Sequence, residues 1–404
     1  MTGDRLGVSL RAVLSGSPLI DGHNDLAWAM RSLAGYDLDR IDIGQPQTAT
    51  RTDLPRLRAG GVGAQFWSVY VPSTLVGGAA LTATLEQVDF VHALIARYPD
   101  QLGLALTADE VGTVFGRGAI ASLIGAEGGH SIACSMGALR MLYALGVRYM
   151  TLTHNDNTPW ADSATDSPRL GGLNAFGRDV VREMNRLGMM VDISHVSAET
   201  MTAALDASEA PVIFSHSSCR ELVDHPRNVP DAVLRRLADN TGVCMVTFVP
   251  DFVSADCAAW SRAAVAEMER RGVNPRAWTA RGQFEAEYAK VEPLPQATLE
   301  QVADHVEHVR EVAGIDHVGI GGDYDGCDAL PVGLEDVASY PRLIAELLGR
   351  GWSQEECRQL TGGNILRVMR EAESTARALV GREPSRATAA DSGAGTPSPP
   401  ASPT

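Results

Sequence analysis

The chain has 404 residues, and 45% of them are apolar, which is enough to bury a large core. Its formal net charge of −16 argues against a nucleic acid or an anionic membrane surface as its partner. The sequence has neither a charged-then-apolar leader pattern nor an apolar run long enough to cross a membrane. Its six cysteines are scattered without a CxxC pair, so we expect reduced thiols and a soluble, cytoplasmic protein.

Short apolar runs alternate along the chain with segments of helical periodicity. Eight runs are expected to form strands: 18–21, 64–71, 119–126, 149–153, 189–194, 212–215, 243–249 and 318–322. Four of the intervening segments repeat apolar residues every three to four positions and predict helices: 85–98, 176–187, 198–205 and 299–312. This alternation is typical of parallel strands covered by helices, and eight strands favour a closed TIM-like (β/α)8 barrel over an open sheet.

Two segments depart from this alternation. Residues 253–296 are charged and rich in Trp and Arg, and they fall between the expected seventh and eighth strands. We interpret them as a helical insertion that serves as a lid or an interface, although a solvated excursion explains their composition equally well. Residues 383–404 have almost nothing large to bury, which predicts a disordered tail. The expected organisation is one catalytic barrel over residues 1–380, followed by that tail.

The first expected strand ends in a pair of side chains of the kind that bind metals. In the segment LIDGHND (19–25), a histidine and an aspartate stand two residues apart. Residues i and i+2 of a strand point to the same side, so His23 and Asp25 aim an imidazole and a carboxylate at one point. Such a pair could form half of a site for a divalent metal.

Other expected strands also end in such side chains. They are Glu127, His154, His195, His216, Asp323 and Asp325. In a barrel these strand ends converge on one face, where the imidazoles and carboxylates would form a ligand set that suits zinc. Each residue alone has an ordinary explanation: a histidine after a strand is more often a packing residue, Glu127 could pair with a cation, and the two aspartates could only form a turn. Their joint placement favours a metal hydrolase.

The remaining histidines and the lysine carry less information. His92, His305 and His308 lie in helical patterns and are expected at the surface, and His130 has no assigned role. Lys290, the one lysine of the sequence, lies in a charged stretch away from any strand end. A carbamylated lysine is therefore not expected to bridge two metals, and a carboxylate has to do so if the site is binuclear.

Seven segments in collinear order carry a resemblance to a known family. They are LIDGHND (19–25), GAEG (125–128), LTHN (152–155), DISHVS (192–197), PVIFSHS (211–217), RNVPD (227–231) and GIGGDYDG (319–326). Together they resemble the motifs of the membrane (renal) dipeptidase family, peptidase family M19, and the similarity extends from about residue 17 to residue 370. The resemblance implies a TIM-like barrel of the metal-dependent amidohydrolase type, a binuclear zinc site and dipeptidase activity.

The resemblance also implies a set of metal ligands by position. His23 and Asp25 would hold one zinc ion, His195 and His216 would hold the second, and Glu127 would bridge the two. This agrees with the expectation of a bridging carboxylate. The two zinc ions of each chain would share a water whose pKa falls to roughly 7, which supplies a metal-bridging hydroxide at neutral pH.

Three further residues match the family's substrate-handling positions. His154 matches the histidine that faces the substrate, and Arg227 matches the arginine that binds the free carboxylate of a dipeptide through its planar fork. Asp323 matches the catalytic aspartate, which would take the proton of the water and deliver it to the leaving amine. The implied substrates are dipeptides, including those with a C-terminal D-residue, and the implied assembly is a homodimer.

The sequence also differs from the animal members of this family. It lacks their signal peptide, lipid-anchor signal and evident disulfide pairing, so we do not expect secretion or membrane attachment. In the loop after the seventh expected strand, Phe252 matches a tyrosine of the animal enzymes, which removes a hydroxyl from the substrate site. Another binuclear amidohydrolase, such as an N-acyl-amino-acid hydrolase or a lactonase, is the alternative function, and a metal-binding scaffold without activity is a third.

Overall fold

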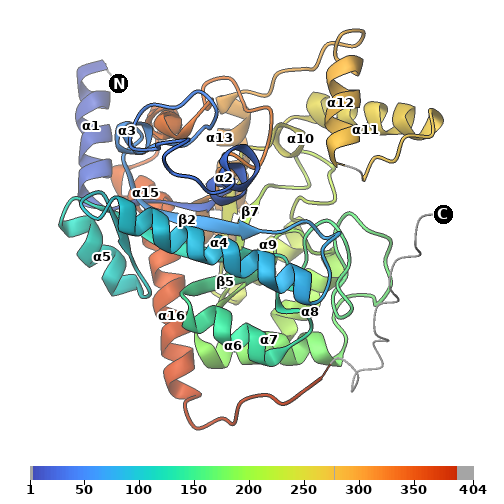
Figure 1. The fold of residues 1–404 in the computed structure, drawn as a ribbon. Coiled ribbons are helices and arrows are strands. Elements are labelled where there is room, and N and C mark those ends of the chain that lie inside the picture. The colour runs from blue at the N-terminus through green and yellow to red at the C-terminus, as the bar shows by residue number, and fades with distance from the viewer. Residues whose placement is uncertain (1–2, 277, 389–404) are drawn as a thin grey trace.

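Eight parallel strands close into a barrel in the computed structural model, which describes residues 3–276 and 278–388 (Figure 1). Their order around the barrel is β1-β2-β4-β5-β6-β7-β8-β9, and β9 pairs with β1 again through Ile320 and Asp21. The strands are β1 (Leu19–Asn24), β2 (Val62–Tyr70), β4 (Ile120–Glu127), β5 (Val147–Thr151), β6 (Met190–Asp192), β7 (Val212–Ser217), β8 (Val243–Val246) and β9 (Val318–Ile320). The predicted (β/α)8 barrel is confirmed, because all eight expected runs form its strands.

A ninth strand, β3 (Leu102–Leu104), was not expected from the sequence. It pairs with residues 120–122 at the start of β4, whereas β5 pairs with residues 124–126 farther along the same strand. β3 therefore extends the sheet at the N-terminal end of β4 and is not one of the eight strands that close the barrel. A three-residue run is too short to show the alternation by which a strand is recognised in a sequence.

Helices surround the barrel, and Figure 1 shows α4 running across its front beside β2. The helices between the first and last strands are α2 (Leu26–Ala34), α3 (Leu54–Ala59), α4 (Gly78–Arg97), α5 (Ala108–Gly116), α6 (Met136–Ala144), α7 (Ala175–Leu187), α8 (Ala198–Ala207), α9 (Asp231–Asp239), α10 (Pro250–Val253), α11 (Ala255–Arg270), α12 (Trp278–Tyr288) and α13 (Leu299–Ala313). Outside them lie α1 (Gly3–Gly16), α14 (Tyr340–Gly349), α15 (Gln354–Arg358) and α16 (Asn364–Ala378). The four helices predicted by periodicity are α4, α7, α8 and α13.

Local sequence explains where several helices begin. The Thr298 hydroxyl accepts a hydrogen bond from the backbone of Gln301, whose side chain accepts one from the Thr298 backbone in return, and α13 starts there. Ser353 and Glu356 form the same reciprocal capping box at the start of α15. Each box satisfies two backbone N–H groups that a helix start otherwise leaves without partners.

The periodicity of α13 nevertheless led to one wrong expectation. His305 was expected at the surface, but it is only 1% exposed, and its Nδ1 accepts a hydrogen bond from the backbone N–H of Cys219 at 3.0 Å. The reason is that α13 contacts both α9 and β8, so a second stripe of this helix is buried. All six cysteines lie in the described part of the chain and are free thiols, as expected.

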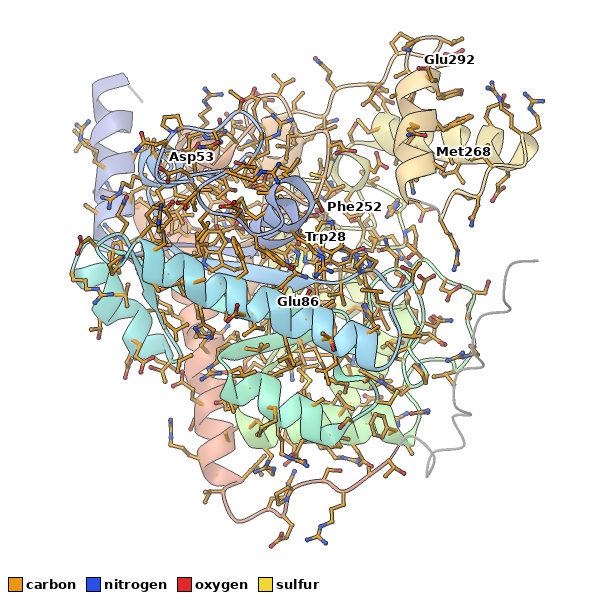
Figure 2. All side chains as sticks on the ribbon, in the orientation of Figure 1. Trp28, Asp53, Glu86, Phe252, Met268 and Glu292 are labelled. Carbon is orange, nitrogen blue, oxygen red and sulfur yellow. The ribbon has the colours of Figure 1, made fainter. Side chains whose placement is uncertain are left out.

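The segment 253–296 contains α11 and α12, which project from one side of the barrel (Figure 1). Figure 2 places Phe252 at the base of this projection and Met268 and Glu292 within it. The indole N–H of Trp260 in α11 donates to the Glu292 carbonyl at 2.7 Å, which ties the end of the segment back to its beginning. Lys290 also lies here, exposed and paired with the neighbouring Glu287. None of the helices in the described ranges combines the length and apolarity that a membrane span requires.

The expected disordered tail, residues 383–404, lies mostly outside the described residues, which end at 388. Of its first six residues, Ser385 contacts the barrel's outer layer. Its backbone N–H donates to the Glu183 carboxylate at 3.1 Å, and its carbonyl accepts from Arg140 at 3.1 Å. The chain after α16 is therefore held against α6 and α7 at least as far as this serine.

The interior of the barrel is filled by side chains, and one of them reaches the site end. Tyr149 of β5 is fully buried among residues such as Phe66, and its hydroxyl donates to the Gly22 carbonyl of β1 at 3.0 Å. A Cβ atom at Gly125 of β4 would lie 2.0 Å from the Tyr149 ring. Only glycine at this position leaves room for a ring that spans the barrel.

We expect the substitution Gly125→Ala to lower the free energy of unfolding by about 1–3 kcal/mol, because the new methyl group overpacks the Tyr149 ring. Urea denaturation would measure the change. Gly112→Ala in α5 is the matched control, since a Cβ there meets nothing within 4 Å. Equal stability of the two variants would show that the packing of the Tyr149 ring does not require a glycine at position 125.

Candidate metal centre

The residues predicted from the strand ends meet at the C-terminal end of the barrel. His23 lies in β1 and Asp25 follows it, Glu127 ends β4, His154 follows β5, His195 follows β6, His216 lies in β7, and Asp323 follows β9. Parallel strands in a closed barrel all end at one rim, which explains the convergence. His195, the most exposed of the five predicted metal ligands, has only 6% of its surface accessible. The ligand set is therefore shielded from bulk solvent.

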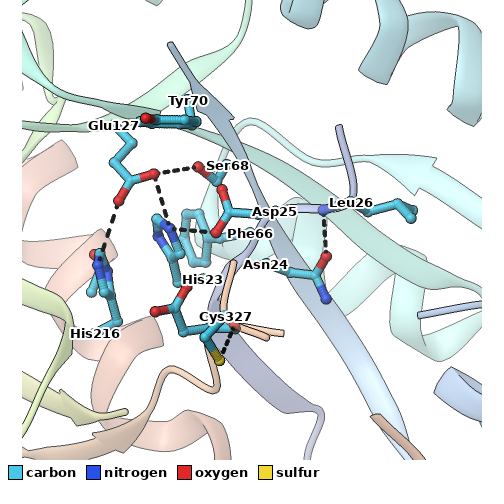
Figure 3. Close-up of polar contacts among 12 residues, drawn as sticks. His23, Asn24, Asp25, Leu26, Phe66, Ser68, Tyr70, Glu127, His216 and Cys327 are labelled. Atoms are coloured by element: carbon cyan, nitrogen blue, oxygen red, sulfur yellow. Dashed lines mark hydrogen bonds and ion pairs between the residues drawn. The ribbon is translucent and has the colours of Figure 1, made fainter. Parts of the chain in front are cut away.

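Four imidazoles surround the carboxylate of Glu127, and Figure 3 shows two of them, His23 and His216. Its Oε2 atom lies 3.4 Å from Nε2 of His23. Its Oε1 atom lies 3.0 Å from Nε2 of His195, 3.6 Å from Nε2 of His216 and 3.7 Å from Nε2 of His154. Each oxygen thus faces a different set of histidines, which is the arrangement a bridging carboxylate requires.

Three overlapping groups of side chains in the described ranges could each hold a metal ion. They are His23, Glu127 and His216; Glu127, His154 and His195; and His23, Asp25 and Asp323. Within each group the ligand atoms lie within 4.8 Å of one another. All five predicted ligands fall into at least one group, and His23 and Glu127 are each shared by two. His154 and Asp323, which were expected to act on the substrate, adjoin the same cluster.

The donor atoms of this cluster fit a metal ion. Nε2 of His23 and Oδ1 of Asp25 are buried and have no hydrogen-bond partner among the described residues. Such groups are costly to leave unsatisfied, and a metal ion would satisfy both. Nε2 of His195 lies 2.9 Å from Nε2 of His216, so two lone pairs face each other unless a proton or a cation lies between them. Imidazole nitrogens and carboxylate oxygens are the ligands that zinc prefers.

Strained backbone positions two of the site residues. His195 has φ of 65° and Asp323 has φ of 60°, in the left-handed region that disfavours residues other than glycine. Strain of this kind persists where surrounding contacts hold it, and it is concentrated at functional sites. Asp325 has φ of 66° as well, but its Oδ1 accepts from the backbone N–H of Arg51 at 2.6 Å. Asp325 therefore anchors a neighbouring loop and belongs to none of the three groups described above.

Burial keeps three imidazoles of the cluster neutral, whereas the pKa of His23 is raised well above its ordinary value, because the nearby Tyr149, Glu127 and Asp25 outweigh its burial. Burial, followed by the charge of Arg227, lowers the pKa of His195 well below its ordinary value, and burial also lowers the pKa values of His154 and His216. Neutral imidazole is the form that binds metals. The pKa of the Asp323 carboxyl is raised well above its ordinary value, first by burial and then by the nearby Asp25 carboxylate.

Comparison with known proteins identifies the family. The sequence model described as "Membrane dipeptidase (Peptidase family M19)" matches residues 8–383. The chain belongs to peptidase family M19. It is 45% identical over 381 residues to "Dipeptidase verJ" of Clonostachys rogersoniana, an alignment that covers 92% of this chain and 88% of that protein. The protein is accordingly a metallodipeptidase of this family, as the motifs implied.

Solved structures support the same fold. The probable dipeptidase PvdM from Pseudomonas aeruginosa superposes with a TM-score of 0.80 at 23% identity, covering 93% of this chain and 100% of that one. A metallopeptidase from Rhodobacter sphaeroides, liganded with a phosphinate mimic of the dipeptide L-Ala-D-Ala, has a TM-score of 0.73 at 22% identity. That alignment covers 88% of this chain and 99% of the other.

A buried arginine lies beside the cluster of candidate metal ligands in this dipeptidase. Arg227 is 2% exposed, and its two terminal nitrogens make long hydrogen bonds, to Ser217 Oγ at 3.4 Å and to the His216 carbonyl at 3.3 Å. Its Nε has no partner in the described part of the chain, and its Cζ lies 5.2 Å from the centre of the Phe252 ring. Burial lowers the pKa of Arg227 to about 10, so the guanidinium stays charged at neutral pH.

The sequence reasoning missed the residues that orient the histidines. The Tyr149 hydroxyl donates its one proton to Gly22, so it must accept from Nδ1 of His23, 2.9 Å away. That contact leaves the Nε2 lone pair of His23 free for a metal. Tyr149 lies within a strand and looks like an ordinary core residue in the sequence.

His216 is oriented in the same way. The Ser215 hydroxyl donates to Asp192 at 2.6 Å and therefore accepts from Nδ1 of His216 at 2.8 Å. Asp192 also accepts from the Thr151 hydroxyl at 2.6 Å, and its side chain is fully buried. An aspartate at the end of an apolar strand was the one signal that could have revealed this support.

We expect Tyr149→Phe to weaken zinc binding by roughly 10–100-fold, because His23 loses the acceptor that fixes its tautomer. Competition with a chromophoric chelator would measure the affinity directly. Tyr98→Phe is the matched control, since its hydroxyl contacts Asp42 on the outer side of the barrel. If Tyr149→Phe binds zinc as tightly as this control, the hydroxyl does not support the metal.

Proposed function

We propose that this metallodipeptidase cleaves dipeptides with two zinc ions held by His23, Asp25, Glu127, His195 and His216. The observation that carries the proposal is the buried Glu127 carboxylate, whose two oxygens face separate imidazoles at 3.0–3.7 Å. When bound, the two ions would supply a water of lowered pKa and would polarise the substrate carbonyl. The overlapping ligand groups support a site for more than one ion.

Arg227 would recognise the C-terminal carboxylate of the substrate. A guanidinium that is buried beside the cluster with an unpartnered Nε and two long hydrogen bonds is poorly neutralised by the protein itself. A substrate carboxylate could form two parallel hydrogen bonds with it. Phe252 covers part of the guanidinium and contributes no hydroxyl, so the recognition of the carboxylate rests on Arg227.

Asp323 and His154 would act on the peptide bond. The pKa of Asp323 is raised towards neutral pH. A carboxyl group with such a pKa can both accept a proton and deliver it to the leaving amine. His154 keeps a neutral imidazole next to the cluster, with its ring 4.7 Å from that of Tyr70. An N–H of this imidazole would stabilise the oxyanion that develops on the carbonyl oxygen.

We also propose the wider features that the family resemblance implies. The relative that carries a phosphinate mimic of L-Ala-D-Ala supports acceptance of a C-terminal D-residue. The proposed organisation is one catalytic barrel over residues 1–380 with the helical insertion at about 253–296, and a tail from 383. The proposed setting is a cytoplasmic homodimer, and the free thiols of all six cysteines agree with a reducing compartment.

The test of the proposal is metal analysis combined with substrate screening. Zinc-loaded protein should contain two ions per chain and should hydrolyse L-Ala-L-Ala and L-Ala-D-Ala. N-acetyl-L-alanine and a simple lactone serve as competitor substrates for the alternative amidohydrolase functions. Faster turnover of either competitor than of every dipeptide would refute the dipeptidase assignment.

We expect Asp323→Asn to lower kcat by about 10²–10⁴-fold, because the amide cannot carry the proton to the leaving amine. Its zinc content should remain near two per chain. Asp328→Asn is the matched control, because Asp328 is exposed in the same loop. Full activity of Asp323→Asn, or loss of its zinc, would remove Asp323 from the proton-transfer role.

Arg227→Met should raise KM for dipeptides by roughly 10²-fold, because a buried charge-assisted contact with the substrate carboxylate is lost. The matched comparison is a dipeptide with an amidated C-terminus, on which wild type and variant should differ little. Steady-state kinetics on both substrates would measure the effect. An equal rise in KM on the amidated substrate would mean that Arg227 does not bind the substrate carboxylate.

A further inference from the structure

Arg276, in the segment between α11 and α12, connects the insertion to a loop of the barrel. Its Nη1 lies 2.6 Å from Oδ1 of Asp156, and its Nη2 lies 2.7 Å from Oδ1 of Asp166. Nη2 also donates to the carbonyl of Thr165 at 3.3 Å. One guanidinium therefore contacts three groups of the loop that follows β5, and nothing in the catalytic proposal uses these contacts.

This loop belongs to the active site and is held firmly. It contains His154, whose carbonyl accepts from the Ser163 hydroxyl at 2.6 Å. Asp166 also accepts from the backbone N–H of Asn157 at 3.0 Å. Asp156 in addition accepts from the hydroxyl of Ser73, which lies in the loop after β2. Asp156 thus joins three segments of the rim: the β2 loop, the β5 loop and the insertion.

The insertion is anchored on the opposite side of the site as well. It starts from α10, where Phe252 packs on the guanidinium of Arg227 and its carbonyl accepts from the Asn228 side chain at 2.8 Å. α10 follows β8, whereas the contact of Arg276 is with the loop after β5. β6 and β7 lie between these two strands in the barrel order, and they carry His195 and His216. The insertion therefore links the rim segment after β8 to the loop after β5, with the ends of β6 and β7 between these two attachment points in the barrel order.

We infer that the insertion is a strap across the mouth of the site and that Arg276 fastens it, which limits substrates to dipeptides. The inference rests on the proposed function. With the substrate's C-terminal carboxylate on Arg227 and its scissile carbonyl at the cluster, an additional N-terminal residue extends beyond the cluster. It meets the rim that Asp156 forms with Arg276 and Ser73. Arg276 is thus a specificity-determining residue.

The exposure of the contact makes this inference testable. The Arg276 side chain is 53% exposed, and those of Asp156 and Asp166 are 37% and 20% exposed. Because these groups reach water, removing one of them leaves no buried, unpaired charge. Variants should therefore fold and keep the catalytic residues in place.

The experiment compares a dipeptide with its N-terminally extended form. For Arg276→Gln, the ratio of kcat/KM for L-Ala-L-Ala-L-Ala to that for L-Ala-L-Ala should rise by about tenfold. The reason is that the loosened strap no longer excludes a substrate with one additional N-terminal residue. Asp166→Asn should raise the ratio in the same direction from the other side of the contact. Arg270→Gln is the matched control, because Arg270 pairs only with Glu267 inside α11 among the described residues. This control should leave the ratio unchanged.

A second readout separates this inference from the catalytic proposal. Hydrogen exchange of residues 255–288 should be faster in Arg276→Gln and Asp166→Asn than in wild type and Arg270→Gln. An unchanged ratio, or no detectable tripeptide hydrolysis in either variant, would overturn the size limit. Exchange rates equal to those of the control would overturn the fastening. A wild-type protein that cleaves no dipeptide would instead refute the proposed function, and the exchange measurement would still test the strap.

Discussion

The carboxylate of Glu127 is buried at the end of β4, with four imidazole Nε2 atoms at 3.0–3.7 Å from its oxygens. A buried charge is expensive unless cations or hydrogen bonds compensate for it. Here the hydroxyl of Ser68 donates to one oxygen at 3.2 Å, and three of the four imidazoles, those of His154, His195 and His216, are neutral and have lone pairs to offer. A pair of metal ions would compensate the carboxylate and occupy those lone pairs together, so this one group organises the whole rim of the barrel.

The barrel supports this carboxylate from below through hydrogen bonds that run across strands. Tyr149 of β5 reaches His23 in β1, and Ser215 and Asp192 hold His216 from behind. In both cases the far ring nitrogen is engaged, which directs the near one into the cluster. Gly125 belongs to the same support, because the absence of its side chain makes room for the Tyr149 ring. The packing of side chains inside the barrel therefore determines the orientation of the candidate metal ligands at its end.

On the proposed function, substrate selection depends on the loops that the barrel presents rather than on the cluster. Arg227 and Phe252 lie on one side of the site, and Asp156 with Arg276 lies on the other. If the inferred strap holds, a substrate between these two groups must match the site in length as well as in chemistry. Amidohydrolases that share a metal cluster can differ in substrate for this reason, since the chemistry belongs to the strand ends and the shape to the loops.

The sequence by itself determined which residues could reach the site, because strand periodicity and collinear motifs mark the last residues of parallel strands, such as His23 and Glu127. It could not reveal β3, the buried side of His305 or the tautomers of the histidines. These depend on neighbours that are distant in the chain, such as Tyr149 for His23. The contact of Arg276 with Asp156 spans 120 residues and leaves no local pattern. Only the tertiary structure decided these features, because a contact between distant segments exists only once the barrel has closed.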